Sequence, residues 1–184
     1  MTLPVIVIVG LVIGRTGNND SGTHPPRTIG APLPALILAA PPSNPATVAP
    51  CVKVLAALPV ELDSLAPRIV HPTPDSPFVV AWGDPPVVLR CGVDRPANLQ
   101  PGSADFVPVV NGVAFFETDV ADGTVYTSID RATYIEVTLP KSIGAGPLPA
   151  LATAIAKALP AVCVPQAGTG EKQPDPATLC THRK

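Results

Sequence analysis

The side chains best suited to chemistry in this sequence are its single tryptophan and a set of charged residues at predicted strand ends and turns. The candidates for a binding site are Trp82, Asp84, Arg90 and Arg131, with Arg95 and Asp130 close to them in the sequence. Arginine guanidinium groups bind carboxylates and phosphates in a planar, bidentate geometry, and an indole ring offers an aromatic floor. One interpretation is therefore a binding patch.

A structural interpretation explains the same residues, and we favour it. In this view Asp84 caps a rigid turn, because the glycine before it and the two prolines after it restrict the backbone. Trp82 then fills the core, whereas Arg90 and Arg131 lie on an exposed face of a sheet.

Conventional catalytic or metal-binding patterns are missing from the sequence. The three histidines, His24, His71 and His182, all lie in proline-rich stretches or in the C-terminal tail. A Ser-His-Asp or Cys-His site needs a histidine that is held rigidly near the nucleophile. Metal-ligand spacings such as Cys-x-x-Cys do not occur. The net charge of −2, without a basic stripe, argues against nucleic acid as a partner. We expect no catalytic residue, no metal and no cofactor.

The four cysteines allow three disulfide pairings if the chain is exported to an oxidising compartment. Cys51 and Cys91 both face the core by pattern, and a bond between them would join a helix to a strand. Cys163 could pair with either one, and Cys180 is the odd residue. The alternative, four free thiols, is favoured if the protein is cytosolic.

The hydrophobic pattern predicts an α+β fold. Residues 51–62 place apolar side chains at helical spacing, and Pro59 ends or kinks that helix. Residues 66–77 read as a proline-rich loop, followed by strands at 78–81 and 87–93. Two hairpin signals follow, Asn111-Gly112 and Asp122-Gly123, and then a strand over 134–139 and a helix over 147–159. We expect an antiparallel sheet of five or six strands, a meander, with both helices on one face.

Composition divides the chain into four parts. Residues 1–15 contain an apolar run that is too short to cross a bilayer and suits a truncated signal segment or a membrane anchor; a buried strand is the alternative. We expect a native start upstream, which would supply the missing basic residues. Residues 16–47 read as a proline-rich linker, with a loosely ordered apolar island at 33–40. Residues 48–164 form the folded domain, and 165–184 a disordered tail.

Several motifs match a known family. Residues 51–59 read CVKVLAALP, residues 81–96 read AWGDPPVVLRCGVDRP, and Asp130-Arg131 precedes YIEVTLP. Together they resemble an uncharacterised actinobacterial family that is catalogued as a domain of unknown function. The resemblance covers about residues 48–163. It implies a small exported or single-span membrane protein with its domain outside the cell, and it carries no established activity.

These observations predict a non-catalytic accessory or binding domain of the cell envelope. The apolar segment at 1–15 would hold it at the plasma membrane, or the protein would be secreted, and its partners would be envelope proteins or glycans. One alternative is an envelope-acting enzyme that uses Trp82, Asp84, Arg90 and Arg131. Another is a structural subunit of a membrane complex.

Overall fold

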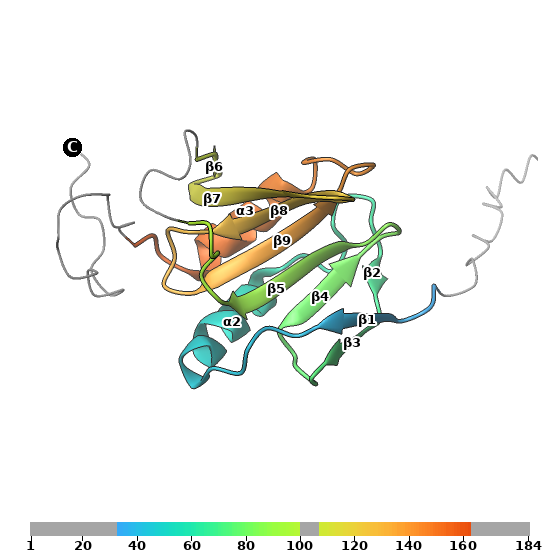
Figure 1. Ribbon diagram of the computed structural model, residues 1–184, viewed down its shortest axis with the longest axis horizontal. Coiled ribbons are helices and arrows are strands. Elements are labelled where there is room, and N and C mark those ends of the chain that lie inside the picture. Colours follow the sequence, from blue (N-terminus) through green and yellow to red (C-terminus); the bar gives the residue numbers. More distant parts are fainter. Residues whose placement is uncertain (1–32, 100–106, 163–184) are drawn as a thin grey trace, which may run out of the picture. The chain divides into compact units, whose positions relative to one another are not determined.

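A seven-stranded antiparallel sheet packs against two helices in the part of the chain that the computed structural model describes, residues 33–99 and 107–162 (Figure 1). The elements are β1 (Leu36–Ala39), α2 (Pro45–Ala57), β2 (Pro67–Arg68), β3 (Val70–Thr73), β4 (Val79–Trp82), β5 (Val87–Val93), β6 (Val109–Val110), β7 (Val113–Val120), β8 (Gly123–Ser128), β9 (Tyr134–Pro140) and α3 (Leu148–Ala158). The predicted α+β class is confirmed, with a slightly larger sheet than the five or six strands expected.

The strand order in the sheet is β2-β4-β5-β9-β8-β7-β6. Strands β6 to β9 are neighbours in sequence order, so the predicted meander is confirmed. Its last strand, β9, then pairs with β5, with Leu89 opposite Val137 and Cys91 opposite Ile135. The β5–β9 ladder therefore joins the β4–β5 hairpin to the meander and forms the centre of the sheet.

Both helices cover the same face of the sheet, as predicted, and lie behind it in Figure 1. Helix α2 starts earlier than expected, at Pro45, because the side chain of Asn44 caps its first turn by accepting a hydrogen bond from the Ala46 N–H. It ends at Ala57, ahead of Pro59. Its buried residues are Cys51 and Val54, and they pack with α3 and with inward side chains of β5, β7 and β9.

The other face of the sheet is partly covered by a small ribbon in which β1 and β3 pair in parallel, Leu36 opposite Val70. This ribbon corrects two expectations. The apolar island at 33–40 is a strand instead of a loosely ordered part of the linker, and the loop expected at 66–77 contains β2 and β3. The physical reason is burial, because Leu36, Leu38 and Val70 pack on Val79 and on neighbouring residues of β4 and β5.

Both predicted hairpins are present. Asn111 and Gly112 have positive φ angles of 46° and 79°, as a type I′ turn requires. In the second hairpin the turn lies one residue earlier than predicted, because Gly123 already pairs with Val120. Gly123 is needed for another reason: a Cβ at this position would lie 2.1 Å from the carbonyl oxygen of Leu139.

No helix within residues 33–99 and 107–162 is long and apolar enough to cross a membrane. The apolar run at residues 3–14, the first half of the predicted linker, Cys163, Cys180 and the predicted tail lie outside the described residues.

Candidate functional site

The structure gives each of the four predicted site residues a different set of partners. Trp82 is buried at the turn end of the β4–β5 hairpin, with 3 % of its surface exposed. Its indole N–H donates to the carbonyl oxygen of Val60 at 3.1 Å, and its ring belongs to the main core. Trp82 therefore acts as a packing residue in this fold.

Asp84 lies in the turn between β4 and β5, and its side chain is exposed. It forms a long ion pair, 3.6 Å, with the buried Arg68 of β2. Arg68 also donates to the carbonyl oxygens of Gly83 and Pro34, both at 2.8 Å. Arg68 thus links the β4–β5 turn to the segment just before β1. The sequence did not reveal this role, because one of these partners is 34 residues away.

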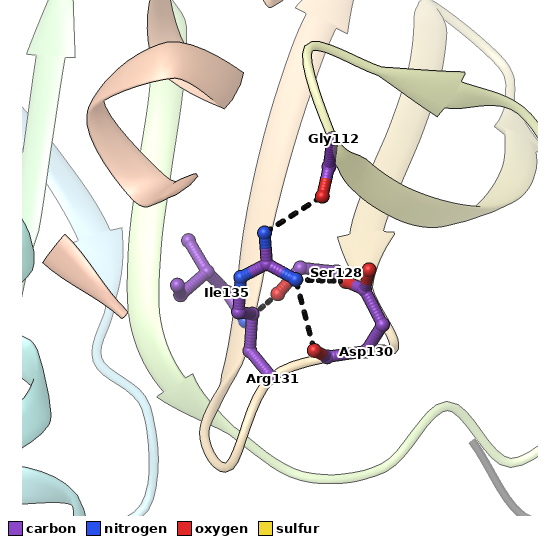
Figure 2. Close-up of polar contacts among 5 residues, drawn as sticks. All are labelled: Gly112, Ser128, Asp130, Arg131 and Ile135. Carbon is purple, nitrogen blue, oxygen red and sulfur yellow. Dashed lines mark hydrogen bonds and ion pairs between the residues drawn. The ribbon is translucent and has the colours of Figure 1, made fainter. Parts of the chain in front are cut away.

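Arg131 is buried, which corrects the expectation that it lies on an exposed sheet face. Figure 2 shows its guanidinium group enclosed between the β8–β9 connection and the β6–β7 turn. It forms an ion pair with the carboxylate of Asp130 at 2.8 Å and donates to the carbonyl oxygen of Gly112 at 2.8 Å. Only 2 % of the Arg131 side chain is exposed, compared with 15 % for Asp130.

The Asp130–Arg131 pair connects several elements. The carbonyl oxygen of Asp130 accepts hydrogen bonds from Arg131 and from the backbone N–H of Val162, which follows α3. Asn111 lies next to Gly112 in the β6–β7 turn, which Arg131 contacts. The Asn111 side chain donates to the carbonyl oxygen of Pro149 and to the hydroxyl oxygen of Thr153, both in α3. Burial raises the pKa of the Asp130 carboxyl group above its ordinary value, and the neighbouring Arg131 offsets part of this rise. The buried pair therefore links the β8–β9 connection to the β6–β7 turn and to the segment after α3.

Arg90 lies on the face of the sheet opposite the helices, as predicted from the alternation along β5. Its Nη1 donates to the carboxylate of Glu136 in β9 at 2.9 Å, and its Nε donates to the carbonyl oxygen of Ala39 in β1 at 3.0 Å. Both side chains of the pair are about one-quarter exposed. Glu136 was not predicted as a site residue, although the alternation over 134–139 already placed it on the polar face of its strand.

Two rows of side chains cross this face around the ion pair. In one row Val88 is opposite Thr138, which is opposite Val125. In the other row Arg90, Glu136, Thr127 and Phe116 are successive partners from β5 to β7. These two rows therefore mix aliphatic, aromatic and threonine side chains with one neutralised ion pair.

A groove with a cavity volume of about 690 Å³ lies on this face, and we call it the outer-face groove; its floor consists of Val88, Thr138, Val125 and the Arg90–Glu136 pair. Its apolar surface comes from β1, the β4–β5 turn and the sheet, through Leu38, Pro85, Val88, Val120, Val125 and Pro140. Asp122, directly before β8, and Lys141, directly after β9, line one end of the groove. A smaller hollow of about 270 Å³ shares Val125 and Glu136 with the groove and extends toward Asn98. The groove brings Arg90, but not Trp82 or Arg131, into a surface that could bind a ligand.

Cys51 in α2 and Cys91 in β5 form a disulfide, with Cα atoms 5.6 Å apart. Both residues are fully buried, so the bond links a helix to the central ladder inside the core. Of the pairings that the sequence left open, the structure thus contains the one between the first helix and the strand. The close approach also explains Gly92, whose added Cβ would lie 2.9 Å from Thr47 Oγ1.

Fold and groove together define a small disulfide-linked α+β domain with a groove on one face of its sheet. Over residues 1–164 the chain matches the family described as protein of unknown function, DUF3515, and it belongs to that family. This match confirms the predicted membership of a family of unknown function. No curated protein and no solved structure matches the chain.

Proposed function

We propose that this protein is a non-catalytic binding or accessory domain of the cell envelope, located outside the plasma membrane. The apolar segment at residues 3–14 would hold it at the membrane or direct its secretion. The observation that carries the proposal is the fully buried disulfide between Cys51 and Cys91. Structural disulfides persist in oxidising compartments and are rare in the reducing cytosol.

The position of the four predicted site residues supports a binding role over a catalytic one. Trp82 and Arg131 are buried in separate structural networks, Asp84 pairs with Arg68, and Arg90 pairs with Glu136. A catalytic site needs reacting groups that converge on one substrate atom. The outer-face groove offers shape and apolar surface instead, which suit recognition of a ligand or a partner.

The location can be tested by mapping the disulfide in the native cell. Membrane, soluble and secreted fractions are separated in the presence of an alkylating reagent, alkylation is completed in denaturant so that buried thiols also react, and each fraction is digested without reduction. We expect the Cys51–Cys91 peptide pair in the membrane or secreted fraction, and its loss in a reduced control. Cleavage of the domain by protease added to intact spheroplasts should confirm the outward orientation. Recovery of alkylated Cys51 and Cys91 from the soluble cell interior would contradict the proposal.

A further inference from the structure

We infer that the outer-face groove binds the hydrocarbon chain of a single-chain amphiphile whose zwitterionic head carries a phosphate and an ammonium group. This inference deepens the proposed function, on which it rests for the supply of envelope lipids. It concerns the groove floor around Val88 and Val125 and the charged end formed by Asp122 and Lys141.

The groove is suited to an aliphatic chain. Its volume of about 690 Å³ falls within the range of about 300–1,000 Å³ for ligand sites that are mostly apolar. Its lining comes from segments far apart in the sequence, because Leu38 of β1, Pro85 of the β4–β5 turn and Val120 of β7 all border the floor around Val88 and Val125. The floor is the interior of a sheet, whose backbone groups are already paired in the ladders. A peptide strand would therefore find no backbone partners here, whereas an alkyl chain needs none.

The charges in the groove are arranged in two different ways. At its centre, Arg90 is neutralised by Glu136 and also donates to the Ala39 carbonyl oxygen, so that the floor has no net charge. At its end, the Lys141 backbone N–H donates to the Asp122 carbonyl oxygen at 2.9 Å, which makes these two exposed residues neighbours. Among the described residues neither side chain forms an ion pair. One free cation beside one free anion is complementary to a head group with a phosphate and an ammonium.

The test uses alkylphosphocholines with chains of eight, ten and twelve carbons, below their micelle concentrations, titrated into the full chain by calorimetry. Each buried methylene should improve affinity about fourfold, so two more carbons should lower the dissociation constant about fifteenfold until the groove is full. Chain-length-independent binding, or no binding at all, would overturn the inference.

Matched variants locate the site. Val120→Asp introduces a charge at a groove residue that is 41 % exposed, and Val109→Asp introduces the same charge at a valine of β6 that is 68 % exposed and does not line the groove. We expect V120D to weaken dodecylphosphocholine binding at least tenfold and V109D to leave it unchanged. Equal effects of the two variants would contradict the assignment. Val125→Asp provides a second groove variant, and thermal unfolding reports whether each variant is folded.

The head-group assignment is tested separately. Lys141→Asp and Asp122→Lys should each weaken binding about threefold to fivefold, and the exchange D122K/K141D should restore most of it. If binding depends on chain length but ignores these charges, the zwitterionic head is wrong. All these binding experiments use purified protein. A negative binding result can therefore be distinguished from a negative result of the disulfide mapping in cells, which tests the proposed function.

Discussion

Replacing the buried Arg131 by methionine should be among the most damaging single changes in this domain. Methionine keeps much of the length and packing of the side chain but removes the charge and the donors. The Asp130 carboxylate would lose its ion pair at 2.8 Å, and the Gly112 carbonyl oxygen would lose its donor at 2.8 Å. Removing one partner of a buried ion pair costs about 3–5 kcal/mol, because a charge is left uncompensated. This is a large fraction of the usual stability of a domain, about 5–15 kcal/mol.

Arg90→Met is the matched control for this experiment. Its ion pair has almost the same length, 2.9 Å, but both of its side chains are about one-quarter exposed. Solvent screens such a pair, so we expect a loss of only about 1 kcal/mol. Free energies of unfolding for both variants are measured on the full chain by urea titration, with the disulfide intact and with circular dichroism as the signal.

The pH dependence provides a second criterion. Arg131 lowers the pKa of Asp130, so its removal raises that pKa further above the ordinary value. The carboxyl group of R131M is then protonated more readily, and the defect should shrink as the pH falls. An R131M loss no larger than that of R90M, or a defect that stays constant between neutral and acidic pH, would show that the buried pair does not stabilise the fold in this way.

Three further predictions concern the core and the sheet. Changing Cys51 and Cys91 together to alanine should cost about 4 kcal/mol in the chain-entropy model, because the bond spans a sequence separation of 40 residues; chemical denaturation with and without reductant checks this value. Gly123→Ala should cost about 1–3 kcal/mol through overpacking against the Leu139 carbonyl oxygen, whereas Gly146→Ala, which has nothing within 4 Å of the added Cβ, should cost less in the same assay. Because burial raises the folded-state pKa of Asp130 above 3.8, this group favours folding below pH 3.8 and loses that contribution as the pH rises through the raised pKa. Wild type should therefore lose stability relative to Asp130→Asn over that window, and a difference that is flat with pH would contradict the burial argument.

Local patterns in the sequence were sufficient for several elements of the fold. The alternation along residues 87–93 placed Cys91 toward the core and Arg90 on the opposite face, and Asn111-Gly112 predicted a tight hairpin with positive φ at both residues. These features depend on backbone preferences and on side-chain periods of two residues, which neighbouring residues define by themselves. The same local information correctly predicted two helices and an antiparallel meander.

Features that depend on distant partners were decided only by the tertiary structure. The parallel β1–β3 ribbon forms because apolar side chains at 36, 38 and 70 are buried together on one face of the sheet. The hydrophobic period within either segment does not predict that the two segments pack side by side. The sequence predicted Arg131 on an exposed sheet face, whereas in the fold it is buried and bonded to the carbonyl oxygen of Gly112, 19 residues away. Arg90 and Glu136 are 46 residues apart, and their pairing follows from the β5–β9 register. Chain composition reports which side chains favour burial or charge, whereas the strand order determines which of them meet, and therefore where a groove can exist.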